Sequence, residues 1–193
     1  MLKIEKGKPW VMWPNLLVAN FIDEPANKIF DHNGDFEVIL NFKLPSEIKS
    51  KSTLFSKLPS YFGIDIEENG LLLILTEETN ITEYKKCEYT WEINKEYELK
   101  INKTNNVIDV YVNDLKYITY VIKTSLAKDD LSHIIFGAGN FPKNGFNLNY
   151  LSLELNCLMI KKDGLTICEH LFDTFIHNKS YDKTGNCNFI HSV

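Results

Sequence analysis

A net positive charge, long apolar runs and a secretory leader are all lacking in this sequence of 193 residues. Lys and Arg number 21 against 26 Asp and Glu, a net charge of -5, whereas a phosphate-backbone binder needs clustered positive charge. No apolar run is long enough to span a bilayer, and the first residues, MLKIEKGKPW, lack the apolar core and cleavage site of a signal peptide. We therefore expect no nucleic acid and no membrane as partners, and assembly in a cytoplasm.

Catalytic and metal-binding signatures are scarce as well. The five histidines lie far apart and show no Ser/His/Asp grouping. The four cysteines have no C-x-x-C spacing, which favours free thiols over a zinc site or a disulfide framework; they are Cys87, Cys157, Cys168 and Cys187. The sequence therefore indicates a binding-type scaffold without a complete catalytic signature.

Alternation of apolar and polar residues is the strongest signal present, and it runs through residues 91–120. Residues 97–102 and 108–113 each alternate, so each predicted strand has one buried face and one wet face. The asparagines of residues 103–106 tolerate the positive φ angles that a hairpin needs, and Asn113-Asp114 offers a second tight turn. These features predict an antiparallel meander.

Similar patterns elsewhere, with little helical periodicity, predict an all-β fold: a two-sheet antiparallel sandwich of jelly-roll type. The other predicted strands are residues 36–44, 53–57, 61–67, 71–76, 88–92, 133–136, 148–158, 165–172 and 188–193. Residues 25–30 and 124–131 could each hold one helical turn. We expect residues 1–30 to form an N-terminal arm or edge segment, followed by a single sandwich domain over residues 31–193.

The order of the strand motifs F-x-V-x-L-x-F (36–42), Y-F-G-I-D-I (61–66), I-x-V-Y-V-N (108–113) and I-I-F-G-A-G (134–139) is distinctive. It resembles the concanavalin A-like lectin and glucanase superfamily, in its laminin-G-like form. Residues 170–190 are similar to an F-D…Y-D-x-S-G-N-x-N element that usually starts such domains. The resemblance implies either that the chain closes its own sandwich in permuted order or that this element pairs with another subunit.

The resemblance also raises the question of glucanase activity. Residues 63–67 (GIDIE) are similar to the glucanase strand on which alternate carboxylates act as nucleophile and acid/base. Gly63 stands at the nucleophile position, so we predict that the chain is not an enzyme. Asp65 and Glu67 are then interpreted as part of a solvated strand face.

Glycan binding calls for exposed aromatic rings beside amides and carboxylates. One loop clusters such residues: Asn140, Phe141, Asn144, Phe146, Asn147 and Tyr150. Trp91 and Tyr111 are further candidates. The alternative is that Trp91 belongs to the core and that Phe141 and Phe146 plug the end of the sandwich.

Two other kinds of site are indicated. The oxygen-rich turns at Asp31, Asn33 and Asp35 and at Asp182, Asn186 and Asn188 could hold calcium, although turns select the same residues without a metal; no other cofactor is expected. The apolar N-terminal residues either pack on the chain's own sheet or anchor it to a partner; they are Trp10, Trp13, Leu16, Leu17 and Phe21.

Members of the resembled family include adhesion proteins, sugar-binding modules and virion surface proteins. We expect a non-enzymatic structural or adhesion component of a phage-like virion, assembled in the host cytoplasm. Its expected partners are other virion subunits or further copies of itself, with host glycan as an additional ligand. The alternatives are a free-standing lectin module and, third, a glycoside hydrolase.

Overall fold

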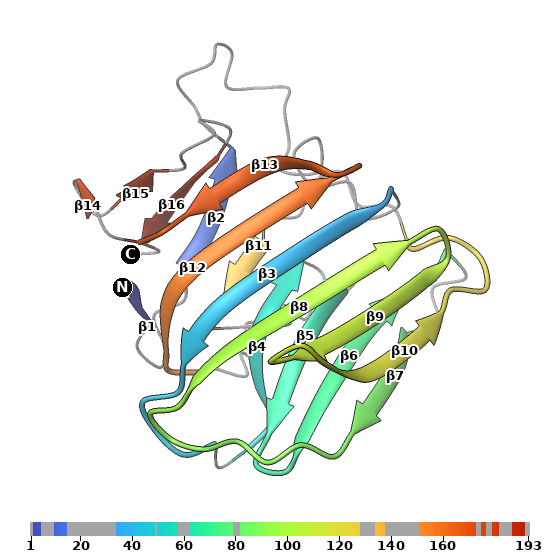
Figure 1. Ribbon diagram of the computed structural model, residues 1–193, viewed down its shortest axis with the longest axis horizontal. Coiled ribbons are helices and arrows are strands. Elements are labelled where there is room, and N and C mark those ends of the chain that lie inside the picture. The colour runs from blue at the N-terminus through green and yellow to red at the C-terminus, as the bar shows by residue number, and fades with distance from the viewer. Residues whose placement is uncertain are drawn as a thin grey trace, which may run out of the picture.

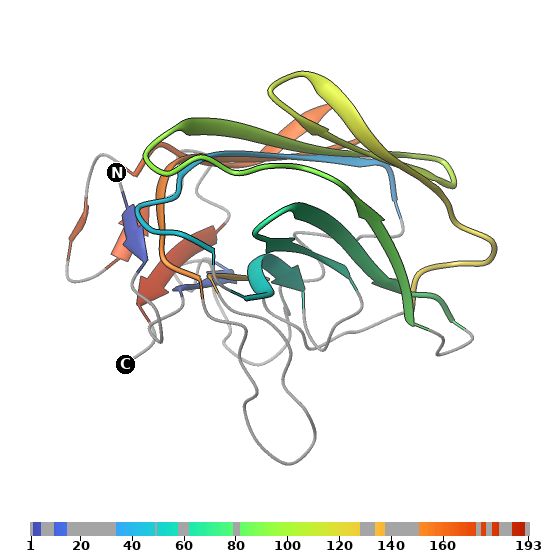
Figure 2. The same cartoon turned by 90° about the horizontal axis from the view of Figure 1, so that it is seen from below.

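The strands of the computed structural model form two antiparallel sheets that pack face to face (Figures 1 and 2). The structure describes residues 2–4, 10–14, 34–48, 50–57, 62–78, 82–127, 134–137, 151–172, 175–176, 179–181 and 187–191. These residues form strands and no helix, so no helix in this part of the chain is long and apolar enough to cross a membrane. The predicted all-β, two-sheet antiparallel sandwich is confirmed.

The first sheet has the order β1-β12-β3-β8-β9-β10, and β13 also pairs with β12. Its strands are β1 (Leu2–Ile4), β3 (Phe36–Lys43), β8 (Glu96–Thr104), β9 (Val107–Val112), β10 (Leu115–Val121), β12 (Leu153–Lys162) and β13 (Leu165–His170). The second sheet has the order β14-β15-β16-β2-β11-β4-β5-β6-β7. Its strands are β2 (Trp10–Pro14), β4 (Ser52–Lys57), β5 (Phe62–Glu67), β6 (Gly70–Thr76), β7 (Thr82–Cys87), β11 (Ile134–Phe136), β14 (Phe175–Ile176), β15 (Lys179–Tyr181) and β16 (Cys187–His191).

The core lies between the two sheets, where the apolar members of each alternating strand meet. In β3 every second side chain is buried, and the register sets Leu40 opposite Leu99 of β8. The second sheet supplies a matching layer of buried residues from β5 and β6: Phe62, Ile64, Ile66, Leu71, Leu73 and Leu75. Each such side chain contributes about 1.5–3 kcal/mol of burial free energy, so the alternation seen in the sequence fixes which face of each strand is inside.

The meander forms as predicted, because its turn residues adopt the backbone conformation that tight hairpins require. Asn113 and Asp114 have φ angles of 49° and 64°, the left-handed conformations of a type I′ turn between β9 and β10. Asn105, between β8 and β9, has φ 54°. Asparagine and aspartate accept this region more readily than most residues, so the sequence predicts both turns correctly.

The connection between β7 and β8 differs from the prediction. Residues 88–92 were predicted as a strand, but they are a loop, and the strand is β7 instead. Tyr89 and Trp91 alternate with polar residues because their rings pack against the core, and not because the segment joins a sheet. Alternate burial of these rings thus produces the period-two pattern of a strand in a segment that makes no strand pairing.

The predicted helical turn at residues 124–131 is also wrong for its described part, residues 124–127. Leu126 forms an isolated bridge with Glu77, and the Ala127 N–H donates to the carbonyl of Thr76. The segment therefore runs extended beside the end of β6. The other helical prediction, residues 25–30, lies outside the described residues.

The two ends of the chain join the sheets of their own molecule. β1 pairs at the edge of the first sheet with β12, whereas β2 is an interior strand of the second sheet between β11 and β16. Cys187–His191 pairs along β2 in the same chain, so this part of the C-terminal element closes its own sandwich. The division into residues 1–30 and 31–193 stays a prediction.

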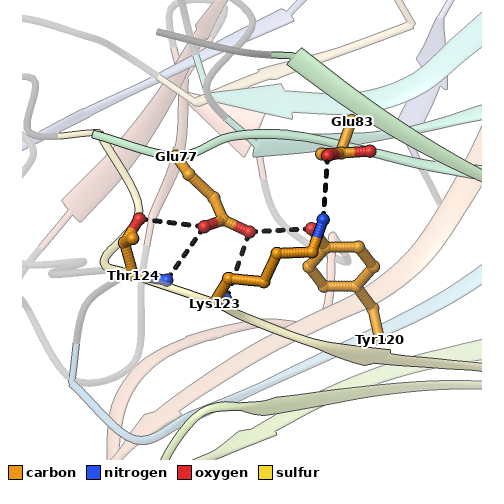
Figure 3. Close-up of polar contacts among 5 residues, drawn as sticks. All are labelled: Glu77, Glu83, Tyr120, Lys123 and Thr124. Carbon is orange, nitrogen blue, oxygen red and sulfur yellow. Dashed lines mark hydrogen bonds and ion pairs between the residues drawn. The ribbon is translucent and has the colours of Figure 1, made fainter. Parts of the chain in front are cut away.

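A buried glutamate joins the two sheets where their edge strands β7 and β10 meet (Figure 3). Glu77 is 4% exposed and follows β6. Its carboxylate accepts hydrogen bonds from the Tyr120 hydroxyl at 2.7 Å, the Lys123 N–H at 3.3 Å, and the Thr124 N–H and hydroxyl, both at 2.9 Å. Burial raises the pKa of Glu77, but these hydrogen bonds outweigh it and hold the pKa below the ordinary 4.5. The carboxylate is therefore ionised and structural at neutral pH.

Candidate functional site

A pocket of about 430 Å³ opens at one end of the sandwich, and three loops build it. They are residues 44–48 after β3, the turn Glu68-Asn69 between β5 and β6, and residues 90–93 before β8. All three lie along the lower edge of the view in Figure 1. Because antiparallel hairpins place alternate connections at the same end of a sandwich, segments far apart in the sequence meet here.

Trp91 forms the aromatic wall of this pocket. Its indole N–H donates to the carbonyl of Gly70 at 3.0 Å, and its ring lies 4.4 Å from Tyr89, 5.0 Å from Tyr97 and 6.0 Å from Phe42, measured between centroids. The side chain is half-buried and packs against the core while lining the pocket. The interpretation of Trp91 as a core residue describes its packing, and its role as a binding platform stays a prediction.

The loop that carries Trp91 is fixed by hydrogen bonds at both ends. The Glu92 N–H donates to the Tyr97 hydroxyl at 2.6 Å, and the Asn94 N–H donates to the carbonyl of Leu44 at 2.8 Å. Asn94 has φ 60°, which turns the chain into β8. The loop is therefore preorganised, so a ligand in the pocket orders little new backbone on binding.

The rim of the pocket is polar and exposed, and its floor is apolar. Leu44 and Ile48 are buried at the floor. The rim carries hydroxyl, amide and carboxylate groups, from Ser46, Glu47, Glu68, Asn69, Thr90 and Glu92. An indole wall with hydrogen-bonding groups around it suits a ligand with an apolar face and many hydroxyls.

The strand with glucanase likeness does not present a catalytic pair. A Cβ atom at Gly63 would lie 3.0 Å from the carbonyl oxygen of Phe55, so a carboxylate side chain has no room there without a shift of β4. The solvated-face prediction is wrong for Asp65, which is 2% exposed. Its oxygens are held by the Thr53 hydroxyl at 2.7 Å and the Lys51 ammonium at 3.1 Å. Glu67 forms an ion pair with Lys86.

The Asp65→Asn variant should gain stability relative to the wild type as pH rises. Burial, the largest influence, raises the pKa of Asp65 above 3.8, despite opposing contributions from Thr53 and Lys51. A carboxyl with a raised folded-state pKa contributes stability that is complete below its unfolded value and lost as pH rises through the folded value. Urea unfolding of both proteins between about pH 3 and pH 7 measures this difference. The opposite trend would show that Lys51 and Thr53 outweigh burial.

The other predicted site residues are placed as follows. The glycan-binding loop candidates Asn140, Phe141, Asn144, Phe146, Asn147 and Tyr150 lie outside the described residues. Tyr111 is described: its ring lies 4.9 Å from the Lys100 ammonium and 5.7 Å from that of Lys116, on the outer face of the first sheet. Two charged side chains therefore accompany this ring.

Of the predicted docking residues, two are described and three are not. Trp10 and Trp13 belong to β2, whose backbone pairs with β11 and β16 of the same chain. Leu16, Leu17 and Phe21 lie outside the described residues. The backbone pairing places Trp10 and Trp13 in a sheet of their own chain, and a docking role for these residues stays a prediction.

The calcium hypothesis stays a prediction. Asp31, Asn33, Asp182 and Asn186 lie outside the described residues, and Asn188 pairs with Trp13 in the second sheet. Asp35 accepts a hydrogen bond from the Asn105 N–H at 2.6 Å, and the Lys103 ammonium donates to the carbonyl of Gly34 at 3.1 Å. No group of three or more His, Cys, Asp or Glu suited to a metal occurs in the described part of the chain.

Solved structures with the same sandwich fold include sugar- and receptor-binding proteins. A proposed carbohydrate-binding protein from Bacteroides ovatus matches with a TM-score of 0.64 at 12% identity, over 100% of this chain and 59% of its own. Botulinum neurotoxin type C, whose cell entry depends on interaction with two ganglioside molecules, matches with a TM-score of 0.53 at 14% identity, over 74% of this chain and 36% of its own. The binding domain of botulinum neurotoxin DC, solved with rat synaptotagmin II, matches with a TM-score of 0.52 at 12% identity, over 78% and 38%.

These similarities show a shared fold. The chain spans less than two thirds of the length of each of these proteins. No protein-family model and no curated protein matches the sequence.

Proposed function

We propose that this protein is a non-enzymatic carbohydrate-binding module whose ligand enters the Trp91 pocket. The observation that carries the proposal is the pocket itself: a fixed indole wall, an apolar floor and a rim of hydroxyl, amide and carboxylate groups. Pyranose rings offer an apolar face and a hydroxyl edge, which this arrangement complements. The shared sandwich fold of a proposed carbohydrate-binding protein adds support.

The lack of a catalytic pair on the described glucanase-like strand β5 supports a binding role over a hydrolase. Retaining glycosidases need two carboxylates about 5–5.5 Å apart across an open cleft. Here Gly63 has no carboxylate, and Asp65 is buried and paired. Incubation with a polysaccharide panel should release no reducing ends, whereas cleavage that disappears in Glu67→Gln would contradict this part of the proposal.

A glycan array separates the pocket from other surfaces. Asn69→Ala and Thr90→Ala each remove one exposed polar group from the rim and should lower glycan binding about three- to tenfold with unchanged stability. Asn102→Ala, on the outer face of the first sheet, is the matched control and should bind as the wild type does. Equal glycan binding by all three variants would show that the glycan binds outside the Trp91 pocket.

The narrower hypothesis of a phage-like virion component rests on the sequence alone. In that setting the module would present its pocket to a host glycan from a particle, or from a homo-oligomer. Sedimentation of the purified protein, alone and with particles from the same source, tests it. Purely monomeric behaviour without particle binding would leave the free-standing lectin module as the better description.

A further inference from the structure

We infer that the Trp91 pocket selects saccharides that carry a free ammonium group and rejects sialylated ones. This inference rests on the proposed carbohydrate-binding function and adds the charge of the ligand. Its basis is the distribution of ionisable groups around the indole wall. Three of the residues that line the pocket are glutamates, and among the described lining residues there is no lysine or arginine.

The negative charge of the rim is only partly neutralised. Lys95 forms an ion pair with Glu92. Within the described part of the chain, Glu47 and Glu68 have no ion-pair partner, and both are exposed on the rim. Two carboxylates on different loops therefore face the same pocket without a counterion from the described residues.

Described lysines close to the pocket loops are committed elsewhere. Lys86 pairs with Glu67, and Lys51 pairs with the buried Asp65. Lys43, next to the first pocket loop, lies 3.8 Å from Glu96. These three ammonium groups are thus paired with carboxylates outside the pocket, and not with Glu47 or Glu68.

The indole adds to the same preference. The face of a tryptophan ring carries partial negative charge and attracts a cation within about 6 Å of its centre. An ammonium group on a sugar in the pocket would therefore meet the indole of Trp91 as well as two carboxylates. The carboxylate of a sialic acid would instead meet like charge on both sides, and like charges in one interface are strongly disfavoured.

Calorimetric titration with three probes tests the inference: a glucosamine disaccharide, its N-acetylated form and sialyllactose. At about pH 6 and low salt, the glucosamine disaccharide should bind about tenfold more tightly than the N-acetylated form, with sialyllactose weakest. The preference should shrink as salt is added, because the rim carboxylates are exposed and screened.

Variants that each remove one carboxylate test whether the rim glutamates cause the preference for an ammonium group. Glu47→Gln and Glu68→Gln should each weaken glucosamine binding about two- to fivefold and leave N-acetylated binding unchanged. Glu78→Gln makes the same change in net charge beyond the opposite end of β6, so it should behave as the wild type.

The outcomes distinguish the charge preference of the pocket from carbohydrate binding itself. Equal affinity for the amine and N-acetylated probes, unaltered in Glu47→Gln and Glu68→Gln, overturns the charge preference and leaves carbohydrate binding standing. Tighter binding of sialyllactose overturns it as well. Absence of binding to any saccharide, charged or neutral, overturns the proposed function and this inference together.

Discussion

Replacing Glu77 with glutamine is expected to lower the free energy of unfolding by about 2–4 kcal/mol. Glutamine keeps one acceptor oxygen but turns its NH₂ group toward two of the four donors that the carboxylate binds, from Tyr120, Lys123 and Thr124. These groups lie at the junction between the sheets, so they cannot all turn to water (Figure 3). Urea unfolding measures the loss as a lower midpoint with an unchanged slope.

Glu83→Gln is the matched control, because Glu83 also binds Lys123 in Figure 3. Its side chain is 36% exposed and that of Lys123 is 70% exposed, and exposed ion pairs contribute about 0–1 kcal/mol. Similar losses in the two variants would mean that Glu77 acts as an ordinary surface charge and not as the junction between the sheets.

The cost of Glu77→Gln should fall in acid. The folded-state pKa of Glu77 is depressed, so its contribution is present above the unfolded value and is lost as pH falls through the folded value. The stabilities of the wild type and the variant should therefore converge as pH falls through the folded-state pKa of Glu77, which lies below 4.5. This trend is opposite in sign to that expected for Asp65. One series of unfolding measurements across pH therefore distinguishes the contributions of Glu77 and Asp65 to stability.

Trp91→Ala is expected to abolish saccharide binding and to lower the free energy of unfolding by about 2–4 kcal/mol. The variant removes the pocket wall, and it also removes a ring that packs on Tyr89 and Tyr97 and a hydrogen bond to Gly70. Binding has to be measured where circular dichroism shows the variant folded, because loss of stability accompanies loss of the site.

Trp91→Phe separates the two effects. It keeps an aromatic wall but lacks the indole N–H, so it should lose about 1 kcal/mol of stability and retain measurable binding. Undiminished binding by Trp91→Ala would remove Trp91 from the site and return it to a purely structural role.

The sequence predicts the fold well where burial and strand pairing coincide. β3 and the meander alternate because one face of each strand enters the core, and the asparagines mark their turns. β7 escapes prediction because it is a polar edge strand, with Tyr84 and Lys85 exposed. The loop of residues 88–92 is mistaken for a strand because packing rings follow the same period.

The candidate site is predictable only in part, for a topological reason. Trp91 attracts attention as a large aromatic residue beside polar ones. Its neighbours in the pocket, such as Glu47 and Asn69, come from loops that meet only once the order of strands is known. Glu77 lies in an unremarkable Thr-Glu-Glu segment. The residues that donate hydrogen bonds to its carboxylate lie 43 to 47 positions further along the sequence.

Nuclear magnetic resonance titration of the labelled protein with a saccharide panel shows whether a saccharide occupies the Trp91 pocket. The backbone amides of Asn69, Thr90 and Ile93 and the indole N–H of Trp91 all lie at the pocket. Binding there should shift these signals together and saturably, with the amides of the meander turns unchanged. No shift with any saccharide, or shifts confined to another surface, would contradict the assignment of the Trp91 pocket as a carbohydrate site.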